Sequence, residues 1–160
     1  MKRLRRALDM MLSLLAASSF LVMVGLTCWQ VFTRYILSAP STWSEELVGY
    51  IFAWMSLLGA CLVTGERGHM NIPLLVNAVS GGARKALLCL GELIALAFSA
   101  VILVYGGTQI SRLAMGQMTS SLGISVGFFY VIMPVCGVVN ILYTILNIKE
   151  ILTNDERRAG

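Results

Sequence analysis

The chain alternates long apolar stretches with short polar segments. Four stretches contain no charged side chain, namely 10–33, 47–65, 93–111 and 113–148. The last is polar and rich in glycine between positions 116 and 123, so its helix is expected to begin near Ile124. Each stretch is long enough to cross a membrane, which takes about 20 mostly apolar residues. We therefore predict four transmembrane helices, at 10–33, 44–65, 86–110 and 124–148.

The composition supports a membrane protein. Hydrophobic residues make up 58% of the 160 positions and charged residues only 12%, whereas about a quarter of an average soluble domain is charged. A soluble fold of this length could not bury so much apolar surface, so membrane lipid must surround much of it. No repeat is visible, and we expect one all-α integral membrane domain over 1–160. No basic patch interleaved with aromatic residues indicates a nucleic acid partner.

The basic residues predict the orientation. Two of them, Arg34 and Arg112, lie in the loops after the first and third helices, and the other ten lie at the opposite ends of the helices. Lys and Arg are enriched on the cytoplasmic side of membranes. The first apolar stretch is longer than the roughly 7–15 residues of a signal-peptide core, so we expect it to remain as a helix. The prediction is a multi-pass membrane protein with both termini in the cytoplasm.

The first outer loop ends in an acidic turn. Thr42 and Glu45 have the spacing of a capping box, and Glu45 and Glu46 lie where a helix dipole favours anions. The acidic pair therefore either starts the second helix or binds a partner protein.

The inner loop contains a second amphipathic segment. Asn71 can cap a short helix with Pro73 in its first turn. Its apolar residues then share one face, namely Ile72, Leu75, Val76 and Val79. We predict a short interfacial helix between the second and third spans, ended by Gly81 and Gly82.

Two irregularities are expected in the fourth span. Pro134 removes a backbone donor and predicts a kink near Tyr130. Gly123 and Gly127 form a small-xxx-small pair, which permits close helix approach.

Few side chains offer chemistry within the membrane. Glu92 lies about two turns from Arg84 and Lys85. We favour an interfacial carboxylate that extends toward these cations, and the other interpretation is a buried contact to another subunit.

The tryptophans are interpreted by their depth in the membrane. Trp54 falls in mid-membrane, where its N–H needs a partner, so it packs within the chain or contacts a neighbouring protein. Trp29 and Trp43 suit the outer aromatic belt.

Cofactor and metal sites are not expected. His69 is the only histidine and lies in a loop, whereas a haem anchor carries histidines inside its helices and a metal site needs several ligands. The cysteines are spread one to a helix without a Cys-x-x-Cys pair, at Cys28, Cys61, Cys89 and Cys136. A disulfide-forming enzyme would need periplasmic pairs, so we interpret these cysteines as apolar packing residues.

The segment from Trp29 to Ile72 combines several short motifs in a fixed order. They are Val31-Phe32-Thr33-Arg34-Tyr35, Trp43-Ser44-Glu45-Glu46-Leu47, Phe52-Ala53-Trp54, Leu57-Leu58-Gly59-Ala60 and Arg67-Gly68-His69-Met70-Asn71-Ile72. This order resembles the small, DctQ-like membrane subunit of tripartite ATP-independent periplasmic (TRAP) transporters. The family usually has Ile or Val at the position of Met70 and often an acidic residue at that of Asn71.

The resemblance implies an auxiliary transport subunit, located as a multi-pass protein in the bacterial cell inner membrane, and no enzymatic activity. In this family a periplasmic substrate-binding protein captures an organic acid such as a C4-dicarboxylate or sialic acid. A large transmembrane subunit then moves the acid inward by an elevator motion driven by a sodium gradient, and the small subunit packs against its scaffold. The resemblance suggests partner-interface residues, namely Arg34, Trp43, Glu45, Glu46, Trp54, Gly59, Gly68 and His69.

Two other classes stay open. One is a membrane anchor of another complex, such as a redox enzyme, which the single loop histidine disfavours. The other is a small proton-coupled exporter, which needs a carboxylate inside its first helix, and 10–33 contains none.

Reporter fusions test the predicted topology. A reporter placed after Gly160 or within residues 66–84 should give a cytoplasmic signal, because ten of the 12 basic residues lie on that side. A periplasmic signal from either fusion would contradict the orientation.

Overall fold

The computed structural model describes residues 2–65 and 82–156, and the described part is helical. The helices are α1 (Lys2–Tyr35), α2 (Thr42–Gly65), α4 (Gly82–Phe98), the π-helix η1 (Ser99–Gly106), α5 (Gly107–Ala114), α6 (Val126–Tyr130) and α7 (Ile132–Glu156). Four spans are long and apolar enough to cross a membrane, namely Arg5–Tyr35, Thr42–Gly65, Ala83–Ala114 and Val126–Leu152. The predicted all-α fold with four spans is confirmed. The interfacial helix expected near Asn71 lies outside the described residues.

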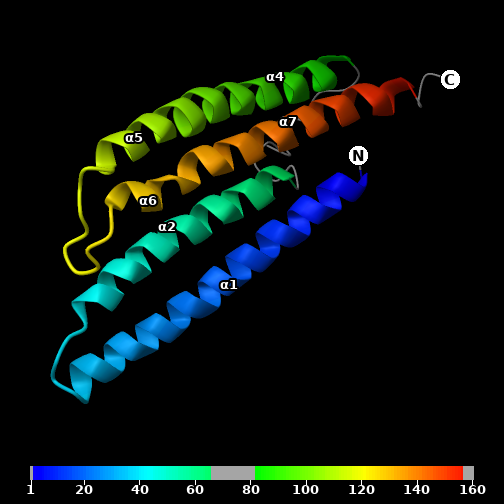
Figure 1. Cartoon of the computed structure of the whole chain (residues 1–160). Coiled ribbons are helices and arrows are strands. Elements are labelled where there is room, and N and C mark those ends of the chain that lie inside the picture. Colours follow the sequence, from blue (N-terminus) through cyan, green and yellow to red (C-terminus); the bar gives the residue numbers. More distant parts are fainter. Residues whose placement is uncertain (1, 66–81, 157–160) are drawn as a thin grey trace.

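The four spans lie side by side in an order that differs from the sequence. Figure 1 shows α1 at one edge, followed by α2, then α7, and α4 with its continuation through η1 and α5 at the other edge. In agreement, α1 packs on α2, α2 packs on α7, and α7 packs on α4 and η1. The start of α1 and the end of α7 lie at the same end of this layer (Figure 1). Which side of the membrane they face remains the prediction given above.

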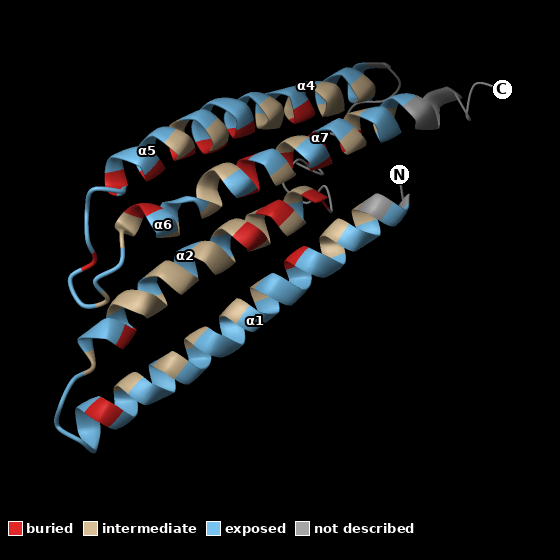
Figure 2. Cartoon of the chain, in the orientation of Figure 1, coloured by how far each residue is buried: buried red, intermediate tan, exposed pale blue. Residues whose placement is uncertain are grey.

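The first span is attached along one narrow seam. Apart from Arg5 and Leu8 near its start, the positions of α1 that are at least half-buried alternate by three and four residues; they are Asp9, Leu12, Ala16, Ser19, Met23, Leu26, Gln30 and Thr33. A mean spacing of 3.5 residues is the packing seam of a coiled coil. The other positions of this 34-residue helix whose burial is described are exposed, as Figure 2 shows. Helix α1 is therefore held chiefly by α2.

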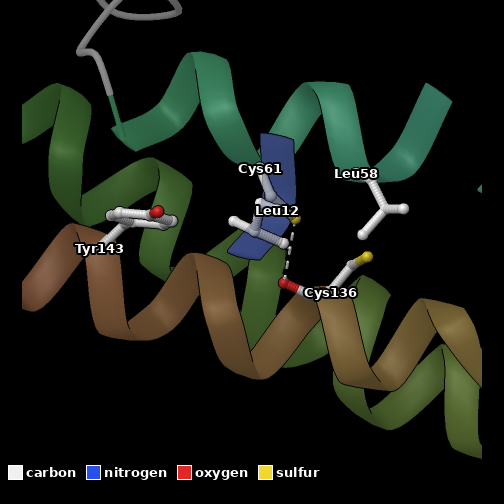
Figure 3. Packing of buried hydrophobic residues seen from close by; sticks show 5 residues of the cluster. All are labelled: Leu12, Leu58, Cys61, Cys136 and Tyr143. Atoms are coloured by element: carbon white, nitrogen blue, oxygen red, sulfur yellow. Dashed lines mark hydrogen bonds between the residues drawn. The ribbon is translucent and has the colours of Figure 1, made fainter. Parts of the chain in front are cut away.

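The buried core is small and lies where α1, α2 and α7 meet. It comprises Leu12, Leu58, Cys61, Cys136 and Tyr143 (Figure 3). The Cys61 thiol lies 3.6 Å from the Cys136 carbonyl oxygen. All four cysteines lie among the described residues and are free. Cys61 and Cys136 are buried packing residues as predicted and Cys89 is half-buried, whereas Cys28 is exposed, so the prediction is wrong for Cys28.

Glycines bring the third and fourth spans into close contact. A Cβ added at Gly107 would lie 2.9 Å from Met133 Cβ, and one at Gly137 would lie 2.8 Å from Leu103 Cβ. A Cβ at Gly127 would lie 2.6 Å from the Ser111 carbonyl oxygen. These contacts follow the rule that small residues let membrane helices approach each other.

The prediction that Gly123 and Gly127 form a pair on one face of the fourth span is wrong for Gly123. Gly123 has φ +64° and lies in the loop before α6, so it does not share a helix face with Gly127. A glycine adopts this left-handed conformation without strain. Only Gly127 serves close packing.

The fourth span is interrupted where Pro134 predicts a kink. Helix α6 ends at Tyr130 and α7 begins at Ile132, so Val131 separates them. Because proline has no N–H, it cannot donate to the carbonyl of Tyr130, four residues earlier. The π-helix η1 lies on the neighbouring span and packs against α7.

Substitution of one glycine tests the close packing. Gly127→Ala should lower stability by about 1–3 kcal/mol, as expected for overpacking, because its Cβ would meet the backbone of Ser111 and Met115. Gly59→Ala is the matched control, since a Cβ there meets nothing within 4 Å. Thermal unfolding of the purified full chain measures both. Equal melting temperatures for the two variants would contradict the packing.

Candidate functional site

Glu46 joins α2 to the loop between α5 and α6, residues 115–125, which is the second of the two predicted outer loops. Its Oε1 accepts a hydrogen bond from the Ser120 N–H at 3.1 Å, and its Oε2 accepts one from the Ser121 N–H at 2.9 Å. Charge-assisted hydrogen bonds of this kind are stronger than neutral ones. Glu46 therefore has a role within the chain that neither sequence interpretation contained, because its partners lie 74 and 75 residues away.

The loop that Glu46 binds is itself ordered by hydrogen bonds. The Thr119 N–H donates to the Ile124 carbonyl at 2.8 Å, and the Ile124 N–H donates to the Thr119 hydroxyl at 3.0 Å. The Val126 N–H donates to the Gln117 carbonyl at 2.9 Å. Gly123 takes the left-handed turn between these pairs. The outer end thus has a defined shape, fixed to α2 through one carboxylate.

Glu45 and Arg34 form a loose pair across the first outer loop. The Arg34 Nη2 lies 3.8 Å from the Glu45 Oε2, and both side chains are more than half exposed. Helix α2 begins at Thr42, and the Glu45 N–H bonds to the Ser41 carbonyl. The predicted capping box of Thr42 with Glu45 is therefore wrong, although Glu45 does lie in the first turn.

Trp54 finds its partner inside the chain. Its indole N–H donates to the Phe129 carbonyl at 2.9 Å. The Phe129 ring stacks on Tyr50, with centroids 3.9 Å apart. Phe129 lies in α6, just before the break at Val131. The break of the fourth span and the tryptophan of the second thus meet at one level of the membrane.

One face of α2 is exposed and lined mainly by small residues. Its exposed positions are Gly49, Phe52, Ala53, Ser56 and Val63, and the half-buried Gly59 lies between Ser56 and Val63. A Cβ at Gly49 or Gly59 would meet nothing within 4 Å, so this face has room for another helix. The exposed residues of α4 and α7 are bulkier, such as Leu93, Ile94 and Leu142. Small residues mark helix contacts in membranes. In this respect the α2 small-residue face differs from the exposed faces of α4 and α7, while α1 also exposes small residues such as Ala17 and Gly25.

Polar contacts tie α1, α2 and α7 together at the end that carries the termini. Arg5 forms an ion pair with Glu150 at 3.0 Å and donates to the Gly65 carbonyl. The Tyr143 hydroxyl donates to Asp9 Oδ1 at 2.6 Å. Sequence reasoning missed this cluster because hydropathy does not reveal which helices are neighbours.

Glu92 is buried within the chain, at 3% exposure, so its burial does not require a second subunit. Whether it extends toward Arg84 and Lys85 stays a prediction. Asn140, Thr144 and Asn147 of α7 are also buried. The chain therefore contains more buried polar groups than its hydropathy indicates.

The predicted interface residues do not form one site. Arg34 and Glu45 lie together near the first outer loop, with Trp43 half-exposed beside them in α2. Trp54 and Gly59 lie farther along α2. Gly68 and His69 lie outside the described residues. Within the parts that are described, no three His, Cys, Asp or Glu side chains gather as metal ligands.

A family model for the DctQ component of tripartite ATP-independent periplasmic transporters matches residues 23–154, which is most of the chain. The sialic acid TRAP transporter small permease protein SiaQ of Vibrio cholerae is 28% identical over 155 residues, covering 95% of this chain and 89% of that protein. The C4-dicarboxylate TRAP transporter small permease protein DctQ of the same species is 30% identical over 82 residues, covering 51% of this chain and 35% of that protein.

A much longer protein also matches. The sialic acid TRAP transporter permease protein SiaT of Haemophilus influenzae is 28% identical over 71 residues, which cover 44% of this chain but only 12% of that protein.

Removal of the two acidic side chains separates their roles. Glu46→Ala should lower stability by about 1–2 kcal/mol, because two backbone N–H groups lose an ionised acceptor that is partly exposed to solvent. Glu45→Ala is the matched control and should cost about 0–1 kcal/mol, as for other exposed ion pairs. Hydrogen exchange at 115–125 should rise only in Glu46→Ala. Equal exchange in the two variants would show that Glu46 does not hold this loop.

Proposed function

The chain belongs to the family of the DctQ component of tripartite ATP-independent periplasmic transporters, and we propose that it is the small auxiliary membrane subunit of such a transporter. It supports a large elevator-type permease in the uptake of an organic acid that a periplasmic binding protein delivers, driven by a sodium gradient. One small permease relative is named for sialic acid and another for C4-dicarboxylate. Because relatives of this one subunit are named for different acids, we assign specificity to the other components.

The single layer of helices is the observation that carries this proposal. In no span is more than 28% of the most apolar 18-residue window buried within the chain. A layer of this kind has two broad apolar faces and little interior. It is suited to lie against a larger membrane protein on one side and lipid on the other.

The SiaT relative supports a large permease as the partner. In that protein a segment similar to this chain forms about an eighth of a polypeptide that is named as a permease. Joining the two units in one chain favours their working side by side. For this protein we accordingly propose that the large subunit lies against the layer formed by the four spans.

We assign the contact to the α2 small-residue face. Gly49 and Gly59 leave open space above the helix, and Ala53 and Ser56 lie exposed between them. Close approach of helices increases van der Waals contact, which is a main source of helix association in lipid. The exposed Arg34–Glu45 pair lies near the outer end of this face and can pair with polar groups of the permease or of the binding protein.

Leucine substitutions test this interface. Ala53→Leu and Gly59→Leu should each reduce co-purification of the co-expressed large permease about tenfold, because overpacking costs about 1–3 kcal/mol and about 1.4 kcal/mol corresponds to tenfold. The melting temperature of the chain alone should stay unchanged, since a Cβ at position 59 meets no atom of this chain.

The matched control is Ala97→Leu, an exposed alanine of α4 that lies near Ile94 and Val101. It should leave co-purification intact. Equal recovery with all three variants would contradict the α2 interface, whereas failure of the unmodified chain to bind any large TRAP permease would contradict the proposed function itself.

A further inference from the structure

The first turns of α1 carry two exposed arginines, Arg3 and Arg6. Residues three apart are neighbours on a helix surface, so both guanidinium groups can reach one ligand. Among the described side chains, neither arginine forms an ion pair or a hydrogen bond. Arg5 differs, because it pairs with Glu150 and donates to the Gly65 carbonyl inside the layer. Arg3 and Arg6 therefore present two positive charges at the free side of α1.

The acidic residue of α1 leaves this charge uncompensated. Asp9 follows Arg6 by three residues, but the structure gives no ion pair between them. The Asp9 Oδ1 accepts the hydroxyl of Tyr143 instead, at 2.6 Å. The first nine residues contain four basic side chains and one acidic side chain. An excess of positive charge thus remains at this end of the helix.

An apolar stripe continues from the two arginines along the edge of the layer. The α1 edge stripe, as we name it, recurs every three or four positions and comprises Arg3, Arg6, Met10, Leu14, Ala17 and Leu21. Met10 and Leu21 are each 71% exposed and Leu14 is 70% exposed. Figure 1 places α1 at the edge of the layer, and Figure 2 shows its exposed side in pale blue. The described chain therefore leaves this stripe uncovered.

The stripe has the length of one membrane leaflet. Arg6 precedes Leu21 by 15 residues, and Leu21 lies at the middle of the uncharged stretch 10–33. At about 1.5 Å per residue, the two positions are about 22 Å apart. Half of a bilayer with its headgroups measures about 20–22 Å. When Leu21 is at the bilayer centre, the arginines thus reach the headgroups of one leaflet.

We infer that the α1 edge stripe binds an anionic phospholipid. The headgroup phosphate lies against Arg3 and Arg6, since guanidinium groups bind phosphate through paired N–H donors. One acyl chain lies along Met10 and Leu14, and the flexible methionine adapts to its shape. The order of charge and then apolar surface matches the order of groups in the lipid.

The apolar part of the stripe favours a lipid over an acidic segment of a partner protein. Such a segment would pair with the arginines but would leave Met10, Leu14 and Leu21 without a matching surface. The lipid covers the edge that faces away from α2, so the α2 small-residue face stays open for the permease. The inference therefore concerns a second surface and does not depend on the proposed transport role.

The test uses the full chain in nanodiscs of phosphatidylcholine and phosphatidylglycerol in equal parts, with identical acyl chains. Native mass spectrometry counts the lipids that stay bound when the chain is released. The chain should retain one phosphatidylglycerol in preference to phosphatidylcholine. Equal retention of the two lipids by the unmodified chain would overturn the inference.

A double substitution tests the headgroup ligands. Arg3→Gln/Arg6→Gln should lower the preference for phosphatidylglycerol about 30-fold, because each such cation contributes about 1 kcal/mol and about 1.4 kcal/mol corresponds to tenfold. Arg84→Gln/Arg112→Gln is the matched control, since it removes the same charge from two exposed positions at opposite ends of the third span. It should keep the preference. An equal preference in the two double variants would exclude Arg3 and Arg6 as ligands.

Two further measurements separate the lipid from other occupants. Replacing chloride by inorganic phosphate at constant ionic strength should leave phosphatidylglycerol bound, because the acyl chain contributes to binding. Its displacement by phosphate would show a simple anion site and overturn the assignment. The lipid should also stay bound when the large permease is co-purified, and its loss there would assign the stripe to a partner protein instead. In either case, recovery of the permease through α2 is measured separately and tests the proposed function alone.

Discussion

Close contact between the third and fourth spans is the constraint on which the other features depend. Helices in lipid gain no hydrophobic free energy by associating, so their contacts depend on packing and on polar bonds. Glycines at 107, 127 and 137 let the backbones approach until any larger side chain would collide. This contact sets the level of the break at Val131, where Trp54 of α2 reaches the Phe129 carbonyl. It also holds the outer ends of α5 and α6 together, so that Glu46 can bind the loop between them.

Helix α2 connects the layer to its surroundings. On one side it contacts α1 and α7, and through the small core it holds Leu12, Cys136 and Tyr143 (Figure 3). Its opposite face carries small residues, of which Gly49 and Ala53 are exposed and Gly59 is half-buried but would leave an added Cβ with nothing within 4 Å. The same helix therefore serves the internal packing and offers the surface to which we assign the permease. The thin interior of the chain accords with a subunit that gains much of its stability in a complex.

Sequence patterns predicted the spans well because length and apolarity are local properties. Pro134 likewise predicted the interruption at Val131, since a missing N–H acts within one turn. The contacts of Glu46 and Asp9 and the burial of Glu92 within the chain were missed because they depend on the spatial order of the helices. Hydropathy does not specify that α7 lies between α2 and α4. The capping box failed for a related reason: Thr42 already lies inside the helix, and Glu45 lies toward Arg34 across the loop.

The length of α1 has a consequence for the surrounding bilayer. A helix of 34 residues measures about 51 Å at about 1.5 Å per residue, and the hydrocarbon layer is only about 30 Å thick. Even its uncharged part, 10–33, exceeds that thickness, so the helix must incline or the lipid around it must thicken. Because the spans are packed side by side (Figure 1), an inclination of α1 is shared by the other three spans. Their outer loops are then displaced sideways from the termini, and a partner that touches both ends of the layer must follow the same slant.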